Sequence, residues 1–524
     1  MDFDCDVLVI GGGPTGLVLS NLLANLGVRV TVLERDAEVY PSPRATHIDE
    51  ETLRNFQATG AMPELEVHTA PFGRFEVVDD DGAALLSEEV VDPAAPHGYL
   101  GARFFDQAAF ERVLRARLRA SAHARLVTGV EAVALDDDGA GVTVRVRALD
   151  GGAARHFRAP WAVGCDGGRS FTREAVGAEM EQLSPKRDWL IVDTALRDPA
   201  DADKLPGNFR YVLDPARLTI YAHGFGRNRR WEFQLGEGEG APDDATLRAW
   251  LSRFVDPARV EVVRVAPYAH RSLVARRWRA GRVLLAGDAA HMMPPSAGQG
   301  MCSGVRDAVN LAWKLHRVVA KGAPESLLDT YERERSRHVR EILAGTLAIG
   351  NRLAANGPLG RWVRRTELRL IANLPAAVQD VMRQQMFRRP ALADGLLDGE
   401  AALHGQHLPQ VEAWRGGARA LSDDVLGYRF ALVSLAPVAA ADLRRAESLG
   451  VDVWRLGRDL PEVDGVLARW MRERGVDFAL VRPDRVVFSA GRITDLSRAL
   501  AALARGLGAG ERPAAEAPAP AAAV

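Results

Sequence analysis

The sequence predicts an α/β protein in which a Rossmann-like nucleotide-binding domain is interrupted by a mainly antiparallel sheet. Three observations predict it: a strand, glycine loop and helix at the N-terminus, alternating strand-like segments in the middle, and a smaller strand and helix pattern near the C-terminus. The chain of 524 residues is also too long for one core, since domains usually hold about 100–200 residues. We therefore expect two large units and a smaller one.

The first element is a short apolar strand that runs directly into a glycine-rich turn. Residues 6–10 read DVLVI, GGGPTG follows, and a helical pattern leads to a second strand, VRVTVLE. In this G-x-G-x-x-G motif, Gly11 makes the turn, Gly13 lets the backbone approach a pyrophosphate, and Gly16 packs helix on strand. Glu34 ends the second strand, where an acid accepts a hydrogen bond from an adenosine ribose. The unit predicts binding of FAD or NAD; a glycine turn that binds nothing is the alternative.

Two later segments are also strands that stop at a Gly and Asp pair. WAVGCDGGRS contains Asp166 and Gly167, and GRVLLAGDAAH contains Gly287 and Asp288. Loops at the carboxyl ends of strands are where open α/β sheets bind ligands. Each aspartate also has a structural alternative, because Asp-Gly is a common turn dipeptide and Asp often caps a helix.

The middle of the chain changes to alternating patterns. Segments between residues 180 and 275, such as WLIVDTAL, LTIYAHGF and RWEFQL, are separated by charged or glycine-containing turns. This pattern predicts an antiparallel sheet inserted into the nucleotide-binding domain. Long helical stretches follow Asp307, and from about residue 405 strands and a helix predict a small α/β module.

Composition excludes several classes of function. The formal net charge of −2 arises from 67 basic and 69 acidic residues spread along the chain, so there is no basic field for nucleic acid. Cys5, Cys165 and Cys302 lie far apart and form no CxxC or Cys/His metal-binding pattern. The N-terminus lacks the basic region of a signal peptide, and no run of about 18 apolar residues suggests a membrane span. We expect a cytoplasmic protein without metal, membrane or nucleic-acid partners.

With these motifs the chain resembles the single-component FAD-dependent aromatic hydroxylases, the group that includes para-hydroxybenzoate hydroxylase. Within that group it is most similar to the 3-(3-hydroxyphenyl)propionate hydroxylase branch. The likeness covers residue 4 to about residue 507, and its supporting strings are RATHIDEETLRNFQATG (44–60), LLAGDAAHMMPPSAGQGMCSGVRDAVNLAWKL (284–315), LLDTYERERSRH (327–338) and VRPDRVV (481–487). The motifs are much more specific for the flavin than for the substrate.

The resemblance implies a domain organisation. Residues 1–179 and 276–400 would form the FAD-binding domain with a helical extension, and residues 180–275 the substrate-binding sheet. Residues 401–508 would form a thioredoxin-like domain that contains no cysteine, which excludes thiol–disulfide chemistry there. Residues 509–524 are poor in large apolar groups and are expected to be disordered.

The resemblance also implies roles for individual residues. Asp288 would hydrogen-bond the ribityl chain of the flavin, with Gln107 beside it, and Arg44 would lie near the pyrophosphate. The Asp166 and Gly167 pair would serve FAD and the reduced nicotinamide. On sequence alone, Arg44 is equally well a surface charge and Gln107 a solvated helix residue. The predicted cofactor-binding residues are Gly11, Gly13, Pro14, Thr15, Gly16, Glu34, Arg35, Arg44, Gln107, Asp166, Gly167, Gly287, Asp288, Gly298, Gln299, Gly300 and Met301.

In this family the flavin carries the chemistry, so no protein nucleophile is expected. The resemblance implies that FAD reduced by NADH or NADPH reacts with O2, and that the resulting C4a-hydroperoxide hydroxylates a phenolic ring. The substrate would be similar to 3-(3-hydroxyphenyl)propionate or would be a larger polyketide or antibiotic phenol, and a homodimer is left open. A flavin-binding regulator without turnover is the alternative from another class.

The loop after Asp288 departs from the family pattern. Pro294 and Ser296 are candidate pocket residues, because members of the family often carry a bulky aromatic residue where this chain has Ser296. The vacated volume would be filled by a larger substrate, since water beside the flavin promotes loss of peroxide. A natural ring bulkier than a hydroxyphenylpropionate is therefore expected, unless Ser296 points away and caps the loop.

Overall fold

The computed structural model describes residues 3–42, 44–91, 95–294, 298–353, 358–375, 378, 390–399 and 401–509. The chain divides into two compact units, one formed by Met1–Ala312 with Glu334–Ala391 and the other by Trp313–Arg333 with Leu392–Val524. Among the described helices, none combines the length and the apolar character that crossing a membrane requires. Each unit has its own sheet and its own hydrophobic core.

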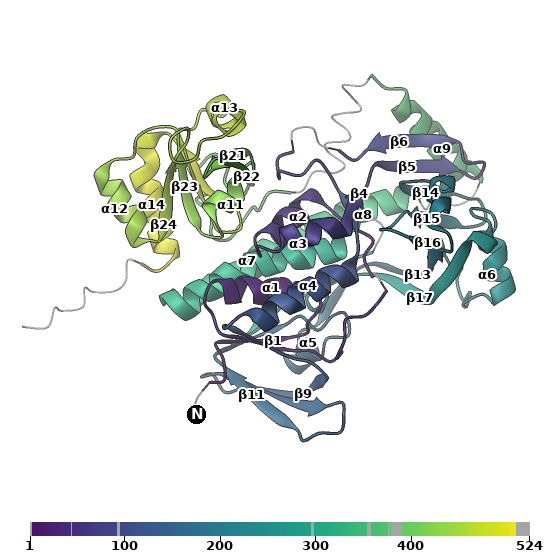
Figure 1. Ribbon diagram of the computed structural model, residues 1–524, viewed down its shortest axis with the longest axis horizontal. Helices are drawn as coiled ribbons and strands as arrows, with labels where there is room; N and C mark the ends of the chain where they lie inside the picture. The colour runs from purple at the N-terminus through teal and green to yellow at the C-terminus, as the bar shows by residue number, and fades with distance from the viewer. Residues whose placement is uncertain are drawn as a thin grey trace, which may run out of the picture. The chain divides into compact units, whose positions relative to one another are not determined.

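The first unit is built on a parallel sheet that contains the N-terminal motif. Its strand order is β18-β19-β12-β1-β2-β8, and only the pair β18 and β19 is antiparallel. The strands are β1 (Val7–Ile10), β2 (Val30–Leu33), β8 (Ala124–Val127), β12 (Trp161–Gly164), β18 (Arg279–Ala280) and β19 (Val283–Leu285). Helices α1 (Pro14–Asn25) and α4 (Gln107–Ala120) pack on each other and on this sheet (Figure 1). The predicted βαβ unit is confirmed.

The turn after β1 requires glycine at two positions for steric reasons. Gly11 has φ +104°, which side chains with a Cβ rarely adopt, and a Cβ there would overlap the backbone of Cys165. A Cβ at Gly16 would overlap the carbonyl oxygen of Gly11. The close approach of β1, β12 and α1 therefore depends on these glycines, as the motif predicts.

A second sheet of the first unit has eight strands in the order β20-β17-β13-β16-β15-β14-β5-β6. The predicted inserted segment supplies β13 (Met180–Leu196), β14 (Phe209–Leu213), β15 (Leu218–Ala222), β16 (Asn228–Gln234) and β17 (Val260–Ala275). The strands from outside that segment are β5 (Arg74–Asp79), β6 (Ala84–Glu89) and β20 (His291–Met292). All neighbours are antiparallel except β14 and β5. The sheet is mainly antiparallel, as expected, and is extended at both edges by strands distant in the sequence.

Smaller elements complete the first unit. Two three-stranded sheets, β3-β7-β4 and β11-β10-β9, contain β3 (His47–Ile48), β4 (Thr69–Pro71), β7 (Arg103–Phe105), β9 (Val130–Asp137), β10 (Val142–Ala148) and β11 (Arg155–Ala159). Further helices are α2 (Glu50–Gln57), α3 (Met62–Leu65), α5 (Phe171–Ala175), α6 (Asp244–Leu251) and α9 (Pro358–Ala372). The long helices α7 (Gln299–Lys321) and α8 (Asp329–Leu353) contribute residues to both units.

The second unit is a small α/β module. Its main sheet has the order β24-β23-β25-β26, with β23 and β24 parallel and the other pairs antiparallel. Its elements are β21 (Glu412–Arg415), β22 (Ala418–Leu421), α11 (Ser422–Leu426), β23 (Phe430–Ser434), α12 (Ala440–Ser448), β24 (Val451–Arg455), α13 (Val466–Glu473), β25 (Phe478–Val481), β26 (Val487–Gly491) and α14 (Leu496–Gly506).

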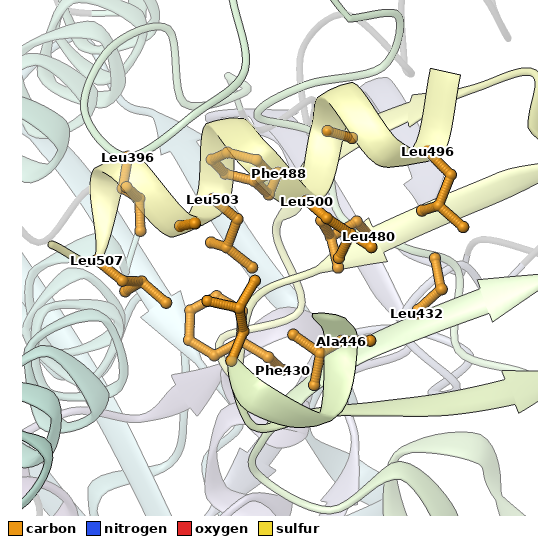
Figure 2. Packing of buried hydrophobic residues seen from close by; sticks show 14 of the residues in the cluster. Leu396, Phe430, Leu432, Ala446, Leu480, Phe488, Leu496, Leu500, Leu503 and Leu507 are labelled. Atoms are coloured by element: carbon orange, nitrogen blue, oxygen red, sulfur yellow. The ribbon is translucent and has the colours of Figure 1, made fainter. Parts of the chain in front are cut away.

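One face of α14 forms much of the core of this module. Leu496, Leu500 and Leu503 recur at helical spacing and are buried against the sheet, where Phe430 and Leu480 belong to the same cluster (Figure 2). An apolar stripe on a helix that covers a sheet is the packing expected of a small α/β module. The strand and helix pattern read from the sequence is therefore confirmed.

The three cysteines all belong to the first unit, where each is buried and forms no disulfide. Burial raises the pKa of all three thiols, that of Cys302 to about 12. A protonated, buried thiol is a poor nucleophile. The expected disordered segment lies outside the described residues, apart from residue 509.

Candidate cofactor and substrate site

A cavity of about 410 Å³ lies between the loops of the parallel sheet and one face of the eight-stranded sheet. Residues that follow β1, β12 and β19 line one side of it, and residues of β13, β14, β16 and β17 line the other. Cofactor sites in proteins have about this size. Of the predicted cofactor residues, those that line it are Gly13, Pro14, Thr15, Arg44, Gln107, Gly167, Asp288, Gly298, Gly300 and Met301.

The N-terminus of α1 faces open space in this cavity. A Cβ at Gly13 would meet no atom within 4 Å, although Gly11 and Gly16 on either side are tightly packed. Pro14 occupies the first turn of α1, where a backbone N–H has no partner within the helix. The free N–H groups of the remaining first turn suit a pyrophosphate.

Glu34 is buried and anchors the glycine loop. Its carboxylate accepts hydrogen bonds from the backbone N–H of Gly12 and, at 2.7 Å, from that of Asp36. Arg115 of α4, which sequence reasoning missed, donates to the carbonyl oxygens of Gly12 at 3.5 Å and Asp36 at 3.4 Å. Ribose binding by Glu34 stays a prediction. Arg35 points to solvent, with 65% of its side chain exposed.

The carboxylate of Asp166 is used within its own loop. One oxygen accepts the hydroxyl of Ser170, and the other accepts the backbone N–H and the hydroxyl of Thr172 at 2.8 and 3.0 Å. Ser170 in turn caps α5 by accepting the N–H of Arg173 at 2.9 Å. The side chain of Asp166 therefore shapes the turn, and Gly167, with φ +83°, carries the loop backbone to the cavity.

Asp288 differs, because its side chain faces the cavity and makes no hydrogen bond with any residue that the structure describes. It lies in the short turn η4 (Gly287–Ala289) that follows β19. Crowding by protein around the cavity raises the pKa of Asp288, and the charges of His291 and Arg44 partly offset that effect. A carboxylate without protein donors has its full accepting capacity available for the hydroxyl groups of a ligand.

A buried network of hydrogen-bonded and charged residues supports the loop that contains Asp288. Asp307 of α7 accepts the backbone N–H of Gly287 at 3.0 Å and pairs with His291 at 2.7 Å and Arg335 at 2.8 Å. Burial alone would raise the pKa of Asp307, but the charges of His291 and Arg335 bring it below its ordinary value. This network could not be predicted from the sequence, because its members lie far apart in the chain.

The N-terminus of α7 reaches the cavity through Gly298 and Gly300. The side chain of Gln299 turns away, donating to Asp49 at 3.0 Å and accepting from Arg306 at 3.0 Å. Its backbone remains at the helix N-terminus, where free N–H groups and the helix dipole favour a negatively charged ligand.

Of the two candidate pocket residues, the structure describes only Pro294, which is not among the residues that line this cavity. Pro294 lines a separate cavity of about 70 Å³, beside Trp189 and His270, whose ring centroids are 4.6 Å apart. Ser296 lies outside the described residues. A substrate larger than a hydroxyphenylpropionate, expected from Ser296, therefore stays a prediction.

Gln107 is buried at the start of α4 and fixes the segment that contains Arg44. Its amide oxygen accepts the backbone N–H groups of Arg44 and Ala45 at 3.0 and 2.7 Å, and its nitrogen donates to Glu111 at 2.7 Å. Arg44 pairs with Glu111 at 3.0 Å and keeps 53% of its side chain exposed. Gln107 is thus no solvated helix residue, because it positions a segment of the cavity wall.

Residues that the sequence left unassigned form the opposite wall. Side chains two residues apart share one face of a strand, which brings alternate residues of β13, β16 and β17 to the cavity. These residues are Ile191, Arg230, Glu232, Arg264, Ala266 and Tyr268. In the sequence, the one signal for these residues is that charged side chains occupy strand positions expected to face inward.

The residues present fit a flavin nucleotide. The open N-terminus of α1 suits a pyrophosphate, the carboxylate of Asp288 suits ribityl hydroxyl groups, and the N-terminus of α7 suits the ring of a reduced flavin, which is negatively charged. The sheet wall across the cavity provides a second side on which an aromatic substrate can bind.

Comparison with known proteins agrees with this geometry. Residues 4–346 match the family described as FAD binding domain, and residues 405–506 match the HcaD C-terminal domain. The chain is 34% identical over 507 residues to the "Probable NADH-specific resorcinol 4-hydroxylase" of Rhodococcus jostii (strain RHA1), which covers 93% of this chain and 92% of that relative. It is also 34% identical over 548 residues to a 3-(3-hydroxy-phenyl)propionate/3-hydroxycinnamic acid hydroxylase of Mycobacterium avium (strain 104), covering 95% and 92% of the two chains.

A solved structure extends the likeness to the fold. The flavin-dependent monooxygenase PieE, in complex with FAD and substrate, has a TM-score of 0.83 at 23% identity, with 97% of this chain and 100% of that chain covered. The sequence relatives match over nearly their full length, and the family match spans the loops that line the cavity. The chain therefore belongs to the FAD binding domain family and is a FAD-dependent aromatic hydroxylase.

Proposed function

We propose that this protein hydroxylates a monocyclic phenol, with NADH as electron donor and O2 as the source of oxygen. The observation that carries the proposal is a single cavity with the cofactor loops on one side and the strand wall on the other. The two relatives are named for resorcinol and for 3-(3-hydroxy-phenyl)propionate, which are both monocyclic phenols.

The size of the cavity supports the smaller class of substrate. The flavin ring and the phenol would share its volume of about 410 Å³. This volume lies toward the lower end of the range for ligand-binding cavities. The larger polycyclic phenol suggested by Ser296 remains the alternative to be tested.

The cofactor would be held by groups from three loops. We place the pyrophosphate at the N-terminus of α1 and the ribityl hydroxyls at Asp288, with the backbone of Gly298 and Gly300 beside the flavin ring. Gln107 acts on the cofactor through the Arg44 segment that it holds.

When bound, reduced FAD activates O2 and supplies the oxygen atom that the ring receives. The chain's own residues orient the phenol and exclude water from the cavity, which limits loss of the oxidant as peroxide. Ile191, Ala266 and Phe209 provide the apolar part of that wall, so that a flat ring can lie against the strands.

We also propose that the second unit is thioredoxin-like in topology. A parallel pair, β23 and β24, continues into the antiparallel strands β25 and β26, and helices α12 and α14 pack on the sheet. The unit contains no cysteine and therefore has no dithiol function. A cytoplasmic location and a homodimer stay predictions.

The test is a turnover screen on purified holoenzyme. Heat denaturation should release one FAD per chain, and monocyclic phenols should accelerate NADH oxidation more than NADPH oxidation. Mass spectrometry should then show one added oxygen atom, with catalase used to measure peroxide separately. A yellow protein whose flavin does not bleach with either nicotinamide in the presence of any phenol would contradict the proposal, and coupled turnover confined to polycyclic phenols would move the substrate to the larger class.

A further inference from the structure

The register of three strands arranges charged residues in rows across the cavity wall. In one row Asp193 of β13 lies between Arg230 of β16 and Arg264 of β17. In the next row Ile191 lies between Glu232 and Ala266. Neighbouring rows on one face are two residues apart along each strand, so the two rows are adjacent.

The first row is internally paired. Asp193 accepts the Nε–H of Arg230 at 2.7 Å with one oxygen and that of Arg264 at 2.8 Å with the other. Arg230 also donates to the carbonyl oxygen of Arg44 at 2.7 Å, which ties the sheet to the opposite wall. Two guanidinium groups share one carboxylate, so this row carries a net positive charge beside Glu232.

Glu232 has no such pairing. It is 6% exposed, and its carboxyl makes no hydrogen bond and no ion pair within 4.0 Å among the residues that the structure describes. Burial raises the pKa of Glu232, an effect that Arg230 and Arg264 partly offset. Buried polar groups in folded proteins nearly always have partners, so a lone carboxyl that lines a ligand cavity points to a partner on the ligand.

The surrounding groups leave few proton acceptors at this wall. Desolvation by the surrounding protein, followed by the charges of Asp288 and Glu232, raises the pKa of Tyr268 to about 12, so its hydroxyl keeps its proton and can act as a donor. The charged and titratable groups that face Glu232 are Arg230, Asp193, Arg264 and Tyr268 on the sheet and Arg44, His47 and Asp288 across the cavity. Both oxygens of Asp193 are already used, and the guanidinium groups accept no proton.

We propose that Glu232 is the base that accepts the proton of the substrate's phenolic hydroxyl group. The inference rests on the proposed hydroxylation of a phenol. The O–H bond of the substrate breaks, its proton moves to a carboxylate oxygen of Glu232, and the electron pair stays on the ring oxygen, which makes the ring electron-rich. After the ring carbon has received its hydroxyl group, the hydrogen of that carbon leaves as a proton to solvent, and Glu232 returns its own proton to the ring oxygen.

The environment of Glu232 suits this task. A carboxylate whose pKa is raised holds a proton more tightly than an exposed one, and is a stronger base toward a weakly acidic phenol. The positively charged row formed by Arg230, Asp193 and Arg264 stabilises the phenolate that forms. The neighbouring position of the wall carries only the small side chain of Ala266. Tyr268 can donate a hydrogen bond within the same part of the cavity.

The experiment compares Glu232→Gln, which removes the base at nearly constant size, with Glu261→Gln, which removes an exposed carboxylate from β17. Both holoenzymes are assayed for hydroxylated product with a series of ring-fluorinated phenols of increasing acidity. We expect Glu232→Gln to lower kcat on the least acidic phenol on the order of a hundredfold. The loss should shrink as the phenol becomes more acidic, because such a phenol ionises without the base. Glu261→Gln should behave as the wild type throughout.

A second readout needs no turnover. A phenol bound to the oxidised holoenzyme should show its phenolate absorbance at higher pH in the wild type than in Glu232→Gln, because an ionised carboxylate beside the phenolic oxygen opposes a second negative charge, and Glu232→Asp should keep part of the difference. An equal loss on all phenols, an unchanged phenolate signal, or a larger effect from His47→Gln would overturn the assignment. If Glu232→Gln fails to fold, Glu232→Asp is the deciding variant. A loss of kcat in Glu232→Asp that does not depend on the acidity of the phenol contradicts the proposal. A wild type that hydroxylates no phenol would instead remove the proposed function.

Discussion

The loops that follow β12 and β19 carry the same two residue types at the ends of neighbouring parallel strands, yet their aspartates have different surroundings. In the first loop, Ser170 and Thr172 occupy both oxygens of Asp166. In the second, Asp307 takes the backbone N–H of the loop, and Asp288 keeps its carboxylate for the cavity. The aspartate of such a loop is therefore free to bind a ligand when another residue forms the hydrogen bonds that support the loop.

The largest effect on stability is expected for Asp307, which supports the loop that contains Asp288. Asp307→Asn leaves the buried Arg335 without its counter-charge, so the free energy of unfolding should fall by about 3–5 kcal/mol. Urea unfolding measures this, with Asp138→Asn, which alters an ion pair at the surface, as the control. A change in Asp307→Asn as small as that of the control would show that the network does not hold the loop.

The next effect concerns cofactor affinity at the second loop. Asp288→Ala should remove an acceptor for ribityl hydroxyls and weaken FAD binding by about 1–3 kcal/mol, or roughly ten- to a hundredfold. The variant should purify folded but largely free of flavin, and Asp288→Asn should retain more, because an amide oxygen still accepts. Titration of the stripped proteins with FAD checks this; normal affinity in Asp288→Ala would mean that the loop binds through its backbone alone.

The same substitution in the first loop should act mainly on stability. Asp166→Ala leaves the donors of Ser170 and Thr172 without an acceptor and should lower the free energy of unfolding by about 1–2 kcal/mol. Its effect on FAD affinity should be smaller than that of Asp288→Ala, measured on the same preparations. A larger loss of FAD affinity in Asp166→Ala than in Asp288→Ala would contradict the roles assigned to the two loops.

The smallest effect is a pH dependence of the protein without FAD. A carboxyl whose pKa is raised in the folded state adds stability at low pH, and that contribution is lost as pH rises through the raised value. The contribution of Asp288 to the stability of the stripped wild type should therefore decrease as pH rises from about 4, the ordinary range of Asp, toward neutrality. Asp288→Asn should reduce this loss and should be more stable than the wild type at neutral pH. Thermal unfolding across pH checks it, and an identical pH profile in both proteins would count against the unpaired state of Asp288.

The parallel nucleotide-binding unit could be predicted from local sequence motifs, and the family and the cofactor from the resemblance that those motifs carry. This was possible because each signal is local: Gly11 and Gly16 must be glycine for β1, β12 and α1 to approach, and this demand is visible in a short stretch of chain. The strand alternation of residues 180–275 and the helix and strand pattern of the second unit are local signals of the same kind.

Which side chains meet in the cavity, in contrast, depends on how distant segments of the chain pack together. Asp166 and Asp288 look alike in sequence, and the partners that distinguish them, Thr172 and Asp307, are fixed by how the loops pack. The sheet wall depends even more on long-range order, because a shift of one residue in the register of β16 against β13 would turn Glu232 away from the cavity. Pairings between distant strands leave no pattern in a single sequence, so the position of Glu232 could be found only once the strands were aligned.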